Sequence, residues 1–332
     1  MARQPYYRIL KPKPGQSLRD APDLTKIFAP YMGRVQLHDR AGGKSDAVTL
    51  EFADDGSIPL PPHGQKLALE LGYKGETPRA RTHLSVDQYA SNGAPATIRM
   101  SATSADFTSE MRAKRERTHQ PTTLGNLLAI LAEPYGVTPV VKPDSLANLQ
   151  LPLIDQAGKS DLGMAVELAD TYGGIFKPGN GKWIILGYDA MPAPQLAIDR
   201  SEVAEWSGHF QARKHYPTVI AHYHDLHLAK RVAVQAGSGE KPITRLDKTF
   251  ATKQIALAHA TARLNKGIRQ ARRLRLRMEG RPELQTMTLV TLTGFRKELN
   301  RAWLITDVTH TIDKGGYRCE VEAEGIADDP TA

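Results

Sequence analysis

The chain has 332 residues, more than one ordinary domain needs, and its 40% hydrophobic and 24% charged residues are typical of globular proteins. Its formal net charge of +8 permits a polyanionic partner but does not require one, because many basic proteins simply present a basic face. The only cysteine, Cys319, excludes an intramolecular disulfide and a multi-cysteine zinc site. No apolar run resembles a signal peptide or approaches the roughly 20 residues of a membrane span, so we expect a soluble chain without a membrane anchor, made in a reducing cytoplasm.

Residues 34–105 favour short β-strands in near-regular succession. In AVTLEF, residues 47–52, apolar and polar side chains alternate, which is the period of a half-buried strand. A DDG turn at 54–56 follows, and then a second alternating segment, QKLALELGY. This spacing predicts a small antiparallel β-barrel or sandwich over residues 1–107.

The pattern then changes to helical spacing. Leucines in TTLGNLLAILAEPYG recur three and four residues apart, and Thr122 or Thr123 is a suitable N-cap. A second helix is expected after Ser160 and ends at Gly173, before a hairpin arm in KPGNGKWIILGY. Residues 108–194 are therefore predicted to form a small α+β module, which ends in the Pro-rich connection MPAPQ.

Residues 195–332 return to strand patterns and are expected to form a second β-barrel. One long basic helix, about 249–272, is inserted into it, with an apolar stripe that includes Leu257, Ala260 and Ile268. The predicted fold class is mainly β with α+β insertions. It comprises two related small antiparallel β-barrels and the α+β module between them.

The stretch LNKGIRQARRLRLRM, residues 264–278, holds six basic residues and no acid. Its first half fits the polar face of an amphipathic helix, and its second half alternates basic and apolar residues as a strand does. This structural interpretation explains every residue, and no aromatic residue is interleaved to stack bases. The alternative is a nucleic-acid grip over residues 263–277. The candidate basic patch consists of Arg263, Lys266, Arg269, Arg272, Arg273, Arg275 and Arg277.

Other constellations give little support to catalysis or metal binding. In HYHDLH, His222 and His224 share one side of a strand, but Asp225 follows directly instead of at the spacing of a metallo-hydrolase. Cys319 fits a buried small hydrophobe, because no His-containing motif points to it. No G-x-S-x-G or H-E-x-x-H motif or carboxylate pair is present, so we predict no catalytic residue, no metal site and no cofactor. A hydrolase with an unrecognised site is a further alternative.

The order of segments resembles the phage late control D family, the tail hub proteins of contractile phages such as Mu. The segment DRAGGKSDAVTLEFADDGSIPLPPHGQKLALELGY resembles the opening barrel of that family. MRAKRERTHQPTTLGNLLAILAEPYGVTPVV is similar to its R-x-x-x-x-x-x-T-T-L segment, and IDQAGKSDLGMAVELADTYGG to its D-Q-x-x-x-S-D-L stretch. GRPELQTMTLVTLTGF and WLITDVTHTIDKGGYRCEVEAE resemble the closing barrel, although the family usually has Gly near Met287. The matching residues of the first segment are Asp39, Ser45, Asp46, Leu50, Phe52, Asp54, Gly56, Gly64, Leu69, Gly72 and Tyr73.

This resemblance covers roughly residues 30–325 and implies a non-enzymatic hub. The family forms a homotrimer in which two tube-like barrels per chain make a pseudo-sixfold ring between the tail tube and the spike. The N-terminal part of VgrG-type spike proteins is similar in fold. The implied partners are the tail tube protein, the tail spike protein, the tape-measure protein and other baseplate proteins, with nucleic acid only in transit. The implied location is the baseplate of the virion tail, and no binding residue is carried over. The basic stretch is then expected to face a neighbouring subunit, the tube or the lumen.

Overall fold

The computed structural model describes residues 3–13, 15–103, 109–191, 194, 196–211 and 216–326. The predicted boundaries at 107/108 and 194/195 both involve residues outside these ranges. The division into three domains therefore stays a prediction, and the parts of the chain are described below by their strands and helices.

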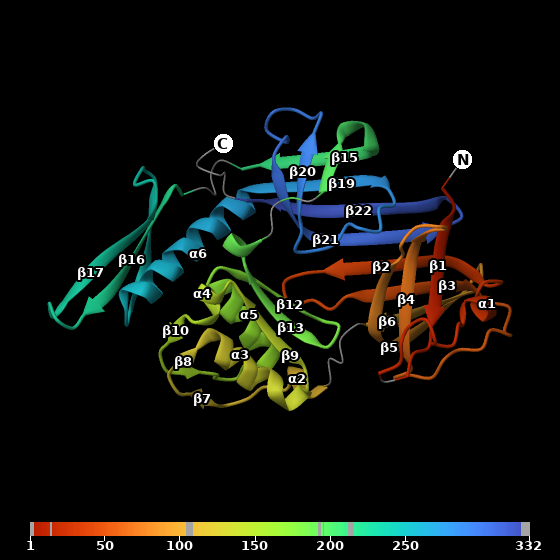
Figure 1. The fold of residues 1–332 in the computed structure, drawn as a ribbon, viewed down its shortest axis with the longest axis horizontal. Helices are drawn as coiled ribbons and strands as arrows, with labels where there is room; N and C mark the ends of the chain where they lie inside the picture. The colour runs from red at the N-terminus through yellow and green to blue at the C-terminus, as the bar shows by residue number, and fades with distance from the viewer. Residues whose placement is uncertain are drawn as a thin grey trace.

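Most strands belong to one 12-stranded, mainly antiparallel sheet that takes strands from both ends of the chain (Figure 1). The expected mainly β fold is confirmed. The N-terminal strands are β1 (Pro5–Leu10), β2 (Met32–Arg40), β3 (Ala47–Ala53), β4 (Lys66–Tyr73), β5 (Arg79–Asn92) and β6 (Thr97–Thr103), with the short helix α1 (Thr25–Phe28). The C-terminal strands are β14 (Leu196–Asp199), β15 (Val203–Phe210), β19 (Arg272–Glu279), β20 (Leu289–Thr293), β21 (Ala302–Asp313) and β22 (Gly316–Gly325).

The two groups of strands are joined directly, because β2 pairs with β21 from Arg34 opposite Asp313 to Arg40 opposite Asp307. The strand order along the sheet is β1-β4-β5-β6-β3-β2-β21-β22-β19-β15. No pairing among the described strands closes either half into a separate barrel. The halves instead share one continuous sheet, since β2 uses its second edge to bind β21.

Alternation along the strands explains the core of this sheet. Side chains at every second position point to one face, so β2 buries Val35 and Leu37, and β19 buries Leu274 and Leu276. A single hydrophobic cluster contains residues of both halves, from Phe52 in β3 to Trp303 in β21. The halves are therefore packed as one body.

The middle of the chain packs helices on a small sheet of β12 (Gly174–Gly179), β13 (Lys182–Gly187) and β9 (Thr138–Lys142). Of the two candidate N-caps Thr122 and Thr123, the structure uses Thr123, and the second helix begins after Ser160 as predicted. The Thr123 hydroxyl accepts the N–H of Asn126 at 3.2 Å, and the Ser160 hydroxyl accepts the N–H of Gly163 at 3.1 Å. The helices are α2 (Ser109–Arg112), α3 (Leu124–Ala132), α4 (Asp144–Ala147) and α5 (Asp161–Thr171), and the remaining two-residue strands are β7 (Thr118–His119), β8 (Thr122–Thr123), β10 (Gln150–Leu151) and β11 (Ile154–Asp155).

Strands β16 (Thr218–Asp225), β17 (Lys230–Gly237) and β18 (Ile243–Phe250) form an arm that projects from the body, and helix α6 (Lys253–Ala271) connects it to β19 (Figure 1, left). Helix α6 is shorter than the predicted 249–272, because β18 continues to Phe250 and the Thr252 hydroxyl caps the helix. The prediction that Leu257 lies on the buried stripe is wrong, since its exposed fraction is 41%. The helix buries Ile255, Ala256 and Ala260 against the arm instead.

The expected departure near Met287 is visible in the backbone. Met287 has a φ of +61°, in the left-handed region that favours glycine, and its N–H donates to the Ile305 carbonyl at 2.9 Å. Met287 therefore holds, in the turn before β20, a backbone conformation that glycine adopts more readily.

Candidate functional site

Two carboxylates lie inside the molecule where the N-terminal strands meet the rest of the chain. Asp39 follows Val35 and Leu37 on the inward face of β2 and is fully buried, and Asp46 precedes β3 with an exposed fraction of 2%. The turn between them is held against the middle of the chain, because the N–H groups of Gly42 and Gly43 both donate to the carbonyl of Phe176, at 3.0 and 3.2 Å. Only glycine fits at position 43, where φ is +81° and a Cβ would lie 2.4 Å from the Val166 side chain.

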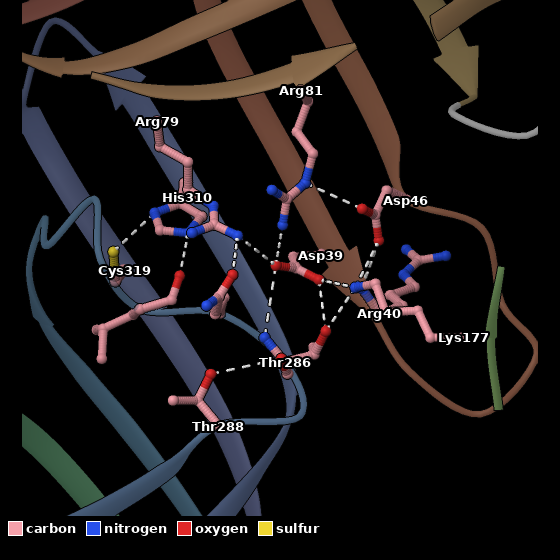
Figure 2. Close-up of polar contacts among 12 residues, drawn as sticks. Asp39, Arg40, Asp46, Arg79, Arg81, Lys177, Thr286, Thr288, His310 and Cys319 are labelled. Atoms are coloured by element: carbon pink, nitrogen blue, oxygen red, sulfur yellow. Dashed lines mark hydrogen bonds and ion pairs between the residues drawn. The ribbon is translucent and has the colours of Figure 1, made fainter. Parts of the chain in front are cut away.

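Three cations surround these carboxylates (Figure 2). Arg81 of β5 binds Asp39 through Nη2 and lies with Nε 2.9 Å from Asp46 Oδ2. Lys177 of β12 binds Asp39 through Nζ, which is also 3.2 Å from Asp46 Oδ1. Arg79 completes the group, with Nη2 3.4 Å from Asp39 Oδ2. We call these five residues the ionic junction.

The second half of the chain also contributes to the ionic junction. Thr286, between β19 and β20, donates its hydroxyl to Asp39 Oδ1 at 2.6 Å and accepts from Lys177 Nζ at 2.6 Å. Gln285 accepts from Arg79 Nη2 at 2.7 Å. The junction thus fastens together β2 and β5, the small sheet at β12, and the loop before β20.

The two junction carboxylates have pKa shifts of opposite direction. Burial alone would raise the pKa of Asp39, but Lys177 and Arg81 outweigh it and hold that pKa well below its usual range. Burial and the charge of Asp39 raise the pKa of Asp46. Burial and the neighbouring Arg81 lower the pKa of Arg79 to about 10, which leaves it charged at neutral pH. Three cations therefore face two carboxylates inside the protein.

This arrangement suits a structural role better than catalysis. Each junction carboxylate is held by cations, and no cysteine, serine or histidine belongs to the group to act as a nucleophile or base. A buried network of this kind specifies which segments meet, because any other pairing would leave charges unpaired in the core. Its chemical consequence is a fixed relative placement of three segments far apart in the sequence.

A second buried polar group consists of His310, Tyr317 and Cys319. Figure 2 shows His310 and Cys319 beside Arg79 of the junction. His310 Nε2 lies 3.2 Å from the Leu284 carbonyl, which requires a proton on Nε2, and Nδ1 is then the acceptor for Tyr317 Oη at 2.8 Å and Cys319 Sγ at 3.1 Å. Burial raises the pKa of Cys319 to about 12, and burial with the nearby Arg79 lowers the pKa of His310 to about 3.

The sequence shows no His-containing motif that points to Cys319, but the fold places His310 Nδ1 3.1 Å from the Cys319 sulfur. Nevertheless both groups are neutral at physiological pH and Cys319 is fully buried. A neutral thiol without access to a substrate is not a nucleophile. Cys319 is thus the buried small residue that its strand pattern predicts.

The histidines of HYHDLH lie at the tip of the arm. His222 Nδ1 contacts Arg231 Nη2 at 3.0 Å, and Asp225 Oδ1 accepts the N–H groups of His227 and Leu228 at 3.0 and 3.1 Å. The Asp225 carboxylate therefore builds the hairpin turn. In the part of the chain that the structure describes, no group of three or more His, Cys, Asp or Glu residues is placed to hold a metal ion. No described helix is both long and apolar enough to cross a membrane.

The structure separates the candidate basic patch into two parts. On α6, Arg263 is exposed, Lys266 Nζ lies 2.5 Å from Asp170 Oδ2, and Arg269 is buried. The prediction that Arg269 lies on the exposed polar face of this helix is wrong. Its guanidinium stacks 3.4 Å from the centre of the Tyr188 ring, because the end of α6 packs against the body of the protein.

On β19 the predicted alternation is confirmed: Arg273, Arg275 and Arg277 are exposed, and the residues between them are buried. Arg275 binds Glu322, and Arg277 Nη1 lies 3.3 Å from Glu205. Each arginine also has a glutamate opposite it on β22. Arg272 Nη1 donates to the Ile326 carbonyl at 3.4 Å. The glutamates that flank β19 are Glu205, Glu320, Glu322 and Glu324.

The ionic junction was not predicted from the sequence. In the sequence, Asp39 and Asp46 stand out only as residues that match the resembled family, and that match assigns them no role. Arg79 and Arg81 are two residues apart at the start of a strand, which places them on one face, and this was the one local signal available. Lys177 gives no signal, because its partner Asp39 is 138 positions away.

Known proteins resemble this chain both in sequence and in fold. No family model matches the chain. A probable baseplate hub protein of Escherichia phage 186 is 27% identical over 351 residues, which cover 91% of this chain and 90% of that protein. The crystal structure of the 43 kDa tail protein of prophage MuSo2 from Shewanella oneidensis has a TM-score of 0.67 at 16% identity, over 96% of this chain and 98% of that one.

The likeness extends to secretion machinery. The E. coli c3393 protein, described as a component of the type VI secretion system, has a TM-score of 0.59 at 12% identity, over 90% of this chain and 74% of that one. The resemblance to hub proteins of contractile phages is confirmed, and the fold is that of phage tail proteins. The relatives are structural tail and baseplate proteins, not enzymes.

Proposed function

We propose that this chain is the baseplate hub of a contractile phage tail or tail-like particle, where three copies form a pseudo-sixfold adaptor between the tail tube and the spike. The observation that carries the proposal is the match to baseplate hub proteins over nine-tenths of both chains. The virion baseplate is then the site of action, after synthesis in the host. Surfaces rather than a catalytic pocket perform this function.

The structure of the subunit supports such a role. Two groups of strands share one sheet and one core, so each chain presents two β units in a fixed relation. The ionic junction fixes the middle of the chain against both units. An adaptor between tube and spike has to hold its two β units in such a fixed relation.

The alternative, a nucleic-acid-binding protein using residues 263–277, gains no support from side-chain placement. Arg269 is buried, and Lys266, Arg275 and Arg277 already bind carboxylates. Phosphate contacts are made by cations that can reach the nucleic acid, and the number of these contacts sets the salt dependence of binding. The basic patch is instead balanced by the glutamates that flank β19.

The test is the solution mass of the purified protein, measured by light scattering alone and with the spike protein encoded beside it. We expect three copies, either alone or on the spike, and binding to the tail tube protein. A protein that stays monomeric at high concentration and binds neither the spike protein nor the tail tube protein would contradict the hub function. Salt-sensitive DNA binding that is lost when Arg273, Arg275 and Arg277 are replaced would favour the alternative.

A further inference from the structure

A cleft opens to the surface beside the ionic junction. It has a volume of about 540 Å³ and lies between the turn that leads into β5 and the loop that follows β19. Arg79 and Arg81 belong to its lining, and their side chains keep exposed fractions of 13% and 7%. Figure 2 shows Arg79 on one side of Asp39 and Lys177 on the other. Solvent therefore reaches the junction through this cleft, from the side of Arg79.

The charges of the junction do not balance. Arg81 binds Asp39 and lies with Nε 2.9 Å from Asp46. Lys177 contacts the same two carboxylates. Arg79 shares what is already taken, because its Nη2 lies 3.4 Å from Asp39 Oδ2, the oxygen that also accepts from Arg81. Three cations against two carboxylates leave one positive charge in excess, and Arg79 has the longest contact of the three.

The guanidinium of Arg79 is also short of acceptors. Its shortest hydrogen bond in the part of the chain that the structure describes goes to the neutral amide oxygen of Gln285, at 2.7 Å. Its Nε is buried and has no hydrogen-bond acceptor among the described residues. Burial and Arg81 lower the pKa of Arg79 to about 10, so it stays charged at neutral pH. A largely buried cation whose nearest partner is neutral is costly unless an anion completes it.

The acidic residues of the cleft do not supply this anion. Glu76 and Glu283 both line it. Glu76, however, binds Arg3 at 2.7 Å, and Glu283 lies 2.9 Å from Arg281. The contacts that the structure describes include no ion pair between either glutamate and Arg79. The positive charge therefore remains uncompensated at the wall of the cleft.

We propose that this cleft binds an oxyanion, a carboxylate or phosphate group, which takes the place of the Gln285 amide oxygen on Arg79. A guanidinium offers parallel N–H groups to two oxygens of such a group, and these charge-assisted hydrogen bonds are among the strongest in proteins. Gln285 is exposed and lies in a loop, so its side chain can turn away without disturbing a strand. The bound anion brings the junction into charge balance. The site goes beyond the proposed hub function and does not depend on it.

The first measurement compares the urea midpoint in chloride and in inorganic phosphate at neutral pH and equal ionic strength. Phosphate strengthens burial in proteins generally, so the informative quantity is the difference between the midpoint shifts of wild type and Arg79→Gln. We expect the larger shift in wild type, because a ligand stabilises only the chain that binds it. Arg277→Gln is the matched control. It removes the same charge at an exposed position outside the cleft and should respond as wild type does.

The second measurement is a calorimetric titration of the whole chain with inorganic phosphate and, separately, with acetate. We expect the dissociation constant to rise at least about tenfold in Arg79→Gln, because the lost hydrogen bonds are made to a charged group. Acetate reports whether a carboxylate alone fills the site. Circular dichroism establishes that each variant is folded.

A third variant, Gln285→Glu, fills the site from within the chain and leaves all three junction cations in place. It puts a carboxylate where the present acceptor lies 2.7 Å from Arg79. We expect a higher urea midpoint in chloride and loss of the phosphate-specific shift. Gln88→Glu adds the same charge at an exposed position outside the cleft and should show neither effect.

Binding of the spike and tail tube proteins distinguishes two sources of the anion. If an acidic side chain of a partner occupies the cleft, phosphate and Gln285→Glu both weaken the binding of that partner. If a free anion occupies it, phosphate binds the complex as tightly as it binds the chain alone. Both results support the site. Equal phosphate shifts in wild type and Arg79→Gln would overturn it and leave the hub function standing, and so would a Gln285→Glu variant that keeps the shift of wild type.

Discussion

Replacing Asp39 by Asn is the sharpest test of the ionic junction. The substitution keeps the shape of the side chain and removes one charge at a fully buried position. Arg79, Arg81 and Lys177 would then face Asp46 as the remaining junction carboxylate. Cations left without compensation in the interior are strongly destabilising, so the variant should unfold much more readily than wild type.

The magnitude follows from burial and contact. Arg81 and Lys177 each bind Asp39 directly, and Thr286 donates to it at 2.6 Å. Removing one partner of a buried ion pair costs about 3–5 kcal/mol of unfolding free energy. Glu322→Gln is the control, because its pair with Arg275 is exposed on both sides and such pairs contribute at most about 1 kcal/mol.

The assay is urea unfolding followed by the fluorescence of the three tryptophans. Trp183 is buried in the middle of the chain, Trp303 is buried in the large sheet, and Trp206 is partly exposed. Lys177→Met and the double variant Asp39→Asn/Lys177→Met complete a cycle. Because the two side chains touch, their effects should fail to add by about 1–3 kcal/mol. The double variant restores the charge balance and should be more stable than the sum of the two single effects implies.

An Asp39→Asn variant that is no less stable than Glu322→Gln would refute the stabilising role of the ionic junction. Strict additivity between Asp39→Asn and Lys177→Met would also refute it, because the β12 segment would then not be fastened through this contact. If Lys177→Met unfolds in two separate transitions, the middle of the chain unfolds separately from the sheet.

Two further predictions concern buried groups. Burial and Arg79 lower the pKa of His310 from 6.5 to about 3. The stability that depends on the neutral imidazole is therefore fully present above pH 6.5 and is lost as the pH falls from 6.5 toward 3. The limiting slope is about 1.4 kcal/mol of unfolding free energy per pH unit. His310→Gln should be less stable at pH 8 but show a shallower loss of stability between pH 6.5 and 5 in urea titrations, and an unchanged slope would contradict the neutral imidazole. Arg269→Ala should cost about 2 kcal/mol of unfolding free energy through loss of its stack on Tyr188, whereas exposed Arg263→Ala should change it by less than about 0.5 kcal/mol. Equal thermal midpoints for these two variants would show that Arg269 is not anchored.

Local sequence determined the elements and their faces. Alternation in AVTLEF and RLRLRM correctly predicted strands with one buried side, because a strand exposes successive side chains to opposite faces regardless of what lies next to it. Thr123 and Ser160 were recognisable as N-caps, since a cap satisfies backbone groups within its own turn. The order of these segments was also enough to indicate a resemblance to phage hub proteins.

Only the tertiary structure decided which faces meet. Nothing local requires β2 to pair with β21, and this pairing joins the strands from the two ends of the chain into one continuous sheet. Arg269 follows the spacing of a polar helix face, yet the packing of α6 on the body buries it against Tyr188. Asp39 and Lys177 lie 138 positions apart and form an ion pair only after three segments have come together. Burial of a charge depends on the partner opposite it, and that partner is set by long-range contacts rather than by the periodicity of the chain.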